Sequence, residues 1–119
     1  MFDAALDIGT RIGMLVTFEG SVASMRAEFQ EMAGARRIEA HFEPCLVEEA
    51  MTVLRQGDPE RHNQLLAEAA PALAGCDAVM LAQFSTAQAK DAVSDVLDIP
   101  VLTAPDAAVA RMKAAVMKL

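Results

Sequence analysis

The 119-residue sequence has no tryptophan, no tyrosine, only two cysteines and only two histidines. Cys45 and Cys76 form no CxxC pair, and His41 and His62 have no neighbouring cysteine or histidine at metal-ligand spacing. We therefore expect free thiols and no metal site. No apolar run approaches the roughly 18 residues that span a bilayer, and the first residues carry acids where a secretory signal carries cations. These absences predict a cytoplasmic protein without a membrane segment.

Positive charge is scarce as well. Ten Lys and Arg residues stand against seventeen Asp and Glu residues, and the formal net charge is -7. A chain of this charge gains little from counterion release, so we expect no nucleic-acid partner. Hydrophobic residues make up 54% of the sequence, which is enough to fill one core. We expect a single α/β lobe over residues 1–119, with residues 1–10 as a linker helix or tail.

Short apolar or β-branched runs alternate with longer helical patterns, which is typical of βαβ units and a parallel sheet. The runs predict four strands, at residues 11–17, 37–42, 78–82 and 99–102. The second run alternates polar and apolar residues, which indicates an edge strand, and Pro44 is expected to stop it. The third is continuously apolar and should lie at the sheet centre.

Helix signals fill the intervening segments. The first expected helix covers residues 22–32 with Gly34 as the stop, and the second covers about 46–55 with Gly57 as the stop. The third covers 59–73, with Asp58 as N-cap and Pro71 as a break. A capping box from Ser85 to Gln88 opens a helix over 85–97, and a terminal helix starts at residue 105, with one face formed by Val109, Met112, Val116 and Leu119.

Right-handed crossovers between these elements predict a four-stranded parallel sheet of order 2-1-3-4 in a flavodoxin-like three-layer sandwich. In this order the second strand lies on one side of the first strand and the third strand on the other, so the topological switch point falls between the first and third strands. Ligands of open α/β sheets bind at the carboxyl ends of the strands beside such a point. The loops at residues 17–21 and 83–86 are therefore the expected binding site.

Both loops lead into helices, whose first turns offer unpaired N–H groups and a partial positive charge to a small anion such as a carboxylate. In the simpler interpretation, Ser21 and Ser85 are only helix caps. Glu19 would repel an anion and is expected to point away, and His62 is expected at the surface. The candidate substrate-binding residues are Thr17, Phe18, Gly20, Ser21, Gln83, Phe84, Ser85 and Thr86.

Three segments, residues 11–18, 76–85 and 99–105, together resemble the second half of the Asp/Glu/hydantoin racemase family. The resemblance covers nearly the whole chain in order. It implies a two-lobed enzyme that holds its substrate between similar α/β lobes and needs no cofactor. It also implies one cysteine from each lobe, with the two thiols on opposite faces of the substrate α-carbon.

The sequence departs from that pattern where Gln83 stands at the position of the second-lobe cysteine, and Phe84 where a threonine often follows. An amide cannot shuttle a proton, although its N–H groups can orient a carboxylate. Cys45 is at the expected edge but one strand away from the site. Cys76 is seven residues before Gln83, roughly 23 Å along an extended strand, and so at the opposite edge. The catalytic residues thus stay unassigned.

Two functions follow as expectations. The first is one lobe of a cofactor-independent, racemase-like isomerase acting at the α-carbon of a small carboxylate, and not an active racemase alone. The alternative is a truncated, non-catalytic family member that binds a small carboxylate, or a structural remnant. The expected partners are a small carboxylate or amino-acid ligand and either a second copy in a homodimer or a missing N-terminal lobe, encoded in frame or as a separate chain.

Overall fold

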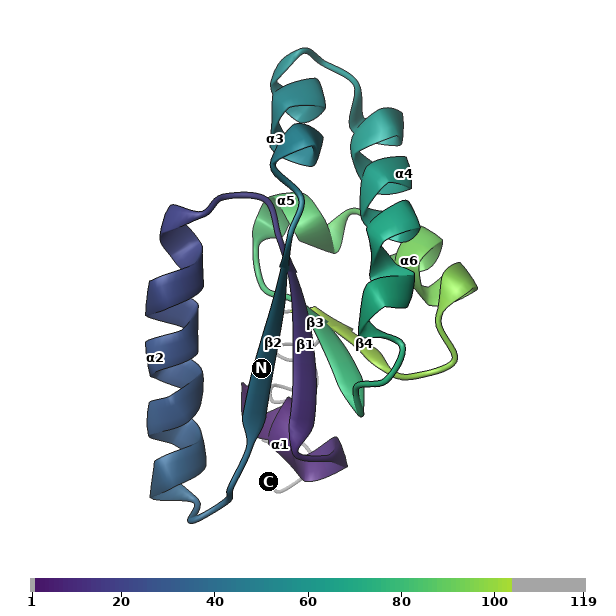
Figure 1. The fold of residues 1–119 in the computed structure, drawn as a ribbon. Helices are drawn as coiled ribbons and strands as arrows, with labels where there is room; N and C mark the ends of the chain where they lie inside the picture. The colour runs from purple at the N-terminus through teal and green to yellow at the C-terminus, as the bar shows by residue number, and fades with distance from the viewer. Residues whose placement is uncertain (1, 104–119) are drawn as a thin grey trace, which may run out of the picture.

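The computed structural model describes residues 2–103, and the predicted terminal helix lies outside the described residues. Four strands form one sheet (Figure 1): β1 (Arg11–Val16), β2 (His41–Leu46), β3 (Ala78–Leu81) and β4 (Val101–Thr103). All neighbouring strands are parallel, and their order is β2-β1-β3-β4. The predicted fold class and strand order are therefore confirmed.

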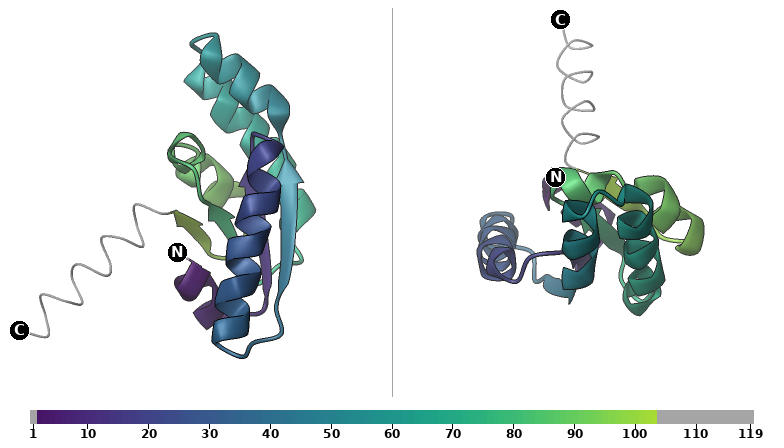
Figure 2. Two further views of the ribbon diagram at one scale, coloured as in Figure 1. Left: turned by 90° about the vertical axis from the view of Figure 1, so that its left-hand side faces the viewer. Right: turned by 90° about the horizontal axis from the view of Figure 1, so that it is seen from above.

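One helix precedes β1, and the others occupy the connections between the strands. Their bounds are α1 (Phe2–Ile8), α2 (Gly20–Ala35), α3 (Glu48–Arg55), α4 (Pro59–Ala69), the 3-10 helix η1 (Ala70–Leu73), α5 (Phe84–Ala87) and α6 (Lys90–Val96). Figures 1 and 2 show α3 and α4 rising as a hairpin above the carboxyl ends of β1 and β2. Within residues 2–103, no helix combines the length and the apolar character needed to cross a bilayer.

The side chains of the central strands alternate between two hydrophobic cores. In β1, Ile12, Met14 and Val16 join the core under α1 and α2, whereas Leu15 joins the core under α3, α4, η1 and α6. The same alternation continues in β3. Since successive strand residues point to opposite faces, this division makes the molecule a three-layer α/β sandwich.

The second strand differs from its prediction at both ends. It begins at His41 and continues through Pro44 to Leu46, so the expected stop at Pro44 is wrong. The edge position is confirmed. A proline has no N–H to donate, but on an edge strand the backbone of alternate residues faces away from the sheet and no ladder bond is lost.

Two helices end in the same hydrogen-bonded motif. After α3, the Gly57 N–H donates to Leu54 O and the Asp58 N–H to Val53 O, both at 3.0 Å, and Gly57 has φ of 88°. This confirms Gly57 as the stop. After α2, the corresponding left-handed residue is Arg37, with φ of 56°. The predicted stop at Gly34 is wrong, because α2 continues to Ala35.

The segments that contain Pro71 and Ser85 also break the expected helices. As expected, α4 is shortened: it ends at Ala69, and Pro71 lies in the 3-10 turn that follows. After β3, the expected single helix over residues 85–97 is wrong, since α5 and α6 are separate and α5 already begins at Phe84. Gln83, not Ser85, precedes the first turn as N-cap.

Candidate functional site

The loops that follow β1 and β3 meet at the carboxyl edge of the sheet. The Thr17 hydroxyl donates to Gln83 Oε1 over 3.2 Å, and Thr17 is only 2% exposed. β1 and β3 are adjacent in the sheet, with Met14 opposite Met80, so both loops leave it side by side. The structure thus brings together one polar residue from each loop that was a candidate from the sequence.

Gln83 is held at both its backbone and its side chain. Its backbone N–H donates to Thr86 Oγ1 over 3.2 Å, and the Thr86 hydroxyl donates back to Gln83 O over 2.9 Å. The Thr17 bond occupies Gln83 Oε1 and fixes the plane of the amide. Among the described residues, none accepts a hydrogen bond from the Nε2 group of Gln83, so its two donors remain available.

Three of the loop hydroxyls donate their hydrogens inside the protein. The bonds of Thr17 and Thr86 are given above, and Ser21 Oγ donates to Phe18 O over 2.7 Å. Thr86 is also completely buried. Hydrogen bonds of this kind stabilise the loops. The simpler interpretation of Ser21 and Ser85 as helix caps is wrong, because Glu19 and Gln83 are the N-cap residues of α2 and α5. Ser85, which is half-buried, lies in the first turn of α5, the helix that Phe84 begins.

A pocket of about 590 Å³ adjoins this junction, between the β1–α2 loop and α3. The expected residues Thr17, Phe18 and Gly20 line it, whereas Ser21, Gln83 and Ser85 are not among its lining residues. The opposite wall is one face of α3, made of Glu48, Met51, Thr52 and Arg55. Their spacing of three and four residues places them on the same side of that helix.

The α3 wall is a part of the site that the sequence reasoning missed. Neither Glu48 nor Arg55 is among the candidate residues named from the sequence. The spacing that unites them is visible in the sequence, but it does not tell which side of the helix overlooks the sheet edge. That side is set by Ala50, which is fully buried in the core under α3 and α4.

Charge in the pocket is unevenly distributed. Glu48 and Arg55 are separated by seven residues, about 10 Å along the helix axis, so the acid lies at the sheet end of α3 and the guanidinium at the far end. Glu19 also lines the pocket, and it lines a second hollow between α2 and β2 as well, so the expectation that its side chain points away from the ligand stays a prediction. Glu19 and Glu48 line the pocket together with Thr17, and negative charge there favours a positively charged group and disfavours a second acid.

Neither thiol is placed for proton transfer at this site. Cys45 pairs with Leu15 in the sheet and packs against the core under α3 and α4, and burial raises the pKa of its thiol. A raised thiol pKa disfavours the thiolate that acts as base or nucleophile. Cys76 precedes β3 and therefore lies at the amino edge, opposite to Gln83, as expected.

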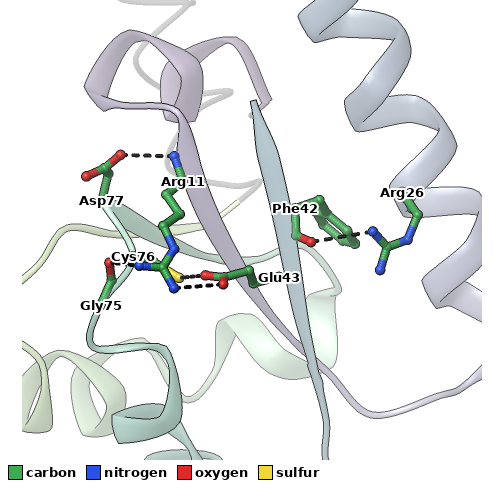
Figure 3. A network of polar contacts seen from close by, with 7 residues as sticks. All are labelled: Arg11, Arg26, Phe42, Glu43, Gly75, Cys76 and Asp77. Carbon is green, nitrogen blue, oxygen red and sulfur yellow. Dashed lines mark hydrogen bonds and ion pairs between the residues drawn. The ribbon is translucent and has the colours of Figure 1, made fainter. Parts of the chain in front are cut away.

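At the amino edge, Cys76 belongs to a polar cluster (Figure 3). Its thiol donates to Glu43 Oε2 over 2.7 Å, and Arg11 Nη2 lies 2.9 Å from Glu43 Oε1. Burial and the Glu43 carboxylate raise the pKa of Cys76 to about 12. The Cys76 thiol and the Arg11 guanidinium in turn hold the pKa of Glu43 below its ordinary value.

The neighbouring Asp77 completes the cluster. Its Oδ2 accepts the backbone N–H groups of Thr10 and Arg11, each over 2.9 Å, and these two bonds lower its pKa. Arg11 also donates to Gly75 O over 3.2 Å. Every charged group in the cluster is therefore paired, which is typical of a structural network that ties β1, β2 and the start of β3 together.

His62 is fully buried, so its expected surface position is wrong. Its Nδ1 lies 2.8 Å from Asn63 Oδ1, and no described residue is a partner for Nε2. His62 lies early in α4, on the helix face that also carries the buried Leu65 and Leu66. Its position is that of a core residue, away from the carboxyl-edge pocket.

Within the part of the chain that the structure describes, no group of three or more His, Cys, Asp or Glu residues is arranged to hold a metal ion. Comparisons with family models, with curated proteins and with solved structures gave no match to this chain.

Proposed function

We propose that the chain is a small-carboxylate-binding lobe of a racemase-like, cofactor-independent isomerase, with its ligand at the carboxyl edge beside Thr17 and Gln83. The observation that carries the proposal is the 3.2 Å bond from Thr17 to Gln83 Oε1. It joins the two loops at the point where ligands of such sheets bind, and it leaves the two N–H donors of the Gln83 amide for a carboxylate.

The pocket charges favour an amino acid over a simple dicarboxylate. In this arrangement the ligand carboxylate accepts from Gln83, and its ammonium group lies toward Glu19 and Glu48, which both line the adjoining pocket. Opposite charges attract, and an acid placed near these two carboxylates would be repelled. A longer ligand could reach Arg55 with a second acidic group at the outer end of the pocket.

Proton transfer at the α-carbon needs an acid or base, and the Gln83 amide cannot act as either. Cys45 is an unfavourable base because burial raises its thiol pKa and it does not line the pocket. Any thiol would come from another lobe or from a second copy across the carboxyl edge. Phe18 and Leu46, which are 57% and 40% exposed at this edge, would be covered in such a homodimer.

Binding is tested by titrating the protein with aspartate, glutamate and succinate, with chemical shifts and the melting temperature as the readouts. We expect shifts at Thr17, Gln83 and Glu19, and a higher melting temperature with the amino acids than with succinate. Ligand at one hundred times its dissociation constant stabilises a protein by about 2.7 kcal/mol. Absence of any shift at the Thr17 and Gln83 amides would overturn the proposal.

A pair of variants separates the amide from general effects on folding. Gln83→Met keeps the length of the side chain but removes its donors and its acceptor, and should weaken binding about tenfold or more. Gln88→Met is the matched control, because Gln88 is an exposed glutamine just beyond α5 and outside the loop junction. Equal loss of binding in both variants would contradict the role given to Gln83.

The second candidate function is binding without catalysis. It is favoured by the glutamine at position 83 and by the raised pKa of Cys45. Solvent deuterium exchange at the ligand α-carbon discriminates the two: the enzyme function predicts exchange, whereas the binding function predicts stabilisation alone. If exchange is seen and Cys45→Ser leaves it unchanged, that thiol has no part in it. A monomer by light scattering at micromolar concentration would count against the homodimer.

A further inference from the structure

The outer edge of β2 presents backbone groups that no other strand of the sheet pairs. The His41 N–H donates to Thr10 O and the Val47 N–H to Val16 O, each over 2.7 Å. In a parallel ladder the backbone of alternate residues faces the same neighbour, so residues 41, 43, 45 and 47 face β1. Phe42, Pro44 and Leu46 therefore direct their backbone groups outward.

Two of these three outward positions are blocked. Pro44 has no N–H to donate to an added strand. The Phe42 carbonyl accepts from Arg26 Nη1 over 3.5 Å, and the guanidinium carbon lies 5.2 Å from the centre of the Phe42 ring. Figure 3 shows Arg26 reaching from α2 to Phe42, on the side of β2 away from Glu43 and Arg11.

The shape of the surface beside β2 agrees with this contact. Two hollows, of about 580 and 450 Å³, lie between α2 and the strand. Pro44 and Leu46 line the first, whereas His41 and Phe42 line the second. Arg26 and Gln30, which are one turn apart on α2, line both hollows, so Arg26 lies where the two hollows meet.

We propose that Arg26 and Pro44 together close the outer edge of β2 to strand addition, so that the chain does not extend its sheet with a second copy of itself. An edge with free N–H and carbonyl groups is a template for pairing, and charged side chains and proline are common means of blocking it. Arg26 occupies the Phe42 carbonyl and the surface beside β2, and Pro44, two residues later, has no N–H to donate to an added strand. The inference is independent of the ligand proposed at the carboxyl edge.

The test compares wild type with Arg26→Ala, Pro44→Val and the double variant, by light scattering and amide hydrogen exchange from micromolar to millimolar concentration. In wild type, the Phe42 amide should exchange at a rate that does not depend on concentration. In the double variant, the apparent mass should rise with concentration and exchange at residues 42, 44 and 46 should slow by about tenfold. Valine at position 44 restores an N–H and suits a strand.

Arg61→Ala is the matched control, because Arg61 is on α4 and pairs with Glu68, away from β2. It should behave as wild type. A double variant whose apparent mass equals that of wild type at every concentration, with its circular dichroism unchanged, would overturn the proposal. So would association of Pro44→Val to the same extent as the double variant, since Arg26 would then contribute nothing. Concentration-dependent protection of the Phe42 amide in wild type would overturn it without any substitution.

Discussion

Replacing Cys76 by serine tests the polar cluster at the amino edge through its response to alkaline pH. The Cys76 thiol is 4% exposed and donates to Glu43, and its pKa is raised from 9.0 to about 12. In the unfolded chain the thiol loses its proton near pH 9, whereas in the folded protein it keeps it. The unfolded state therefore binds fewer protons between these values, and stability falls as the pH rises.

The size of the effect follows from proton linkage. When the thiol is ionised in the unfolded state and protonated in the folded state, the free energy of unfolding falls by about 1.4 kcal/mol for each pH unit. Serine keeps a hydroxyl donor for Glu43 but does not titrate in this range. The difference in slope between wild type and Cys76→Ser should therefore approach about 1.4 kcal/mol per pH unit in the middle of the window.

The assay is urea unfolding under reducing conditions, followed by far-ultraviolet circular dichroism because the chain has no tryptophan or tyrosine. The absence of tyrosine also leaves only the two thiols and the lysines to titrate in this window. Cys45→Ser is the control for the other thiol, whose pKa is also raised by burial. Parallel slopes for wild type and Cys76→Ser would refute the reasoning.

Three further changes test other parts of the fold by urea unfolding. Arg37→Gly should raise the free energy of unfolding by about 1 kcal/mol, because φ of 56° strains a side chain, and an unchanged midpoint would contradict this. Gly13→Ala should lower it by about 1–3 kcal/mol, since a Cβ would lie 3.0 Å from Leu73 Cδ1 and 3.2 Å from Cys76 Sγ. The pKa of Asp77 is lowered, so its contribution to the free energy of unfolding is present above its ordinary pKa of 3.8 and is lost as the pH falls through its folded value. In Asp77→Asn, the free energy of unfolding should therefore fall less steeply as the pH is lowered through this range. An equally steep fall of the free energy of unfolding in both proteins would show that Asp77 contributes nothing to stability in this pH range.

The two edges of the sheet differ in how they use polar groups. At the amino edge Arg11, Glu43, Cys76 and Asp77 satisfy one another. At the carboxyl edge the Gln83 amide keeps its donors, and its hydrogen-bond partner Thr17 lines a pocket of about 590 Å³. Paired groups stabilise a fold, whereas unpaired donors beside a hollow can bind a ligand, and this contrast is why the proposed site is placed at the carboxyl edge.

The sequence by itself determined the strand order and the edge at which each loop emerges. Both depend on local periodicity and on the handedness of crossovers, which act over segments of a few tens of residues. The position of Cys76 at the edge opposite to Gln83 follows in the same way, because it needs only the length of a strand. The stop at Gly57 was also predictable, since a left-handed residue after a helix favours glycine.

Only the tertiary structure decided which side chains meet. The bond between Cys76 and Glu43 joins residues 33 positions apart and depends on the register that places Gly13 opposite Glu43. The α3 wall of the pocket, with Arg55, and the burial of His62 depend on the rotation of α3 and α4 about their axes. Pro44 fits into β2 because only one side of that strand is paired. Register, helix rotation and edge position are set by packing of the whole core, and no local pattern in the sequence encodes them.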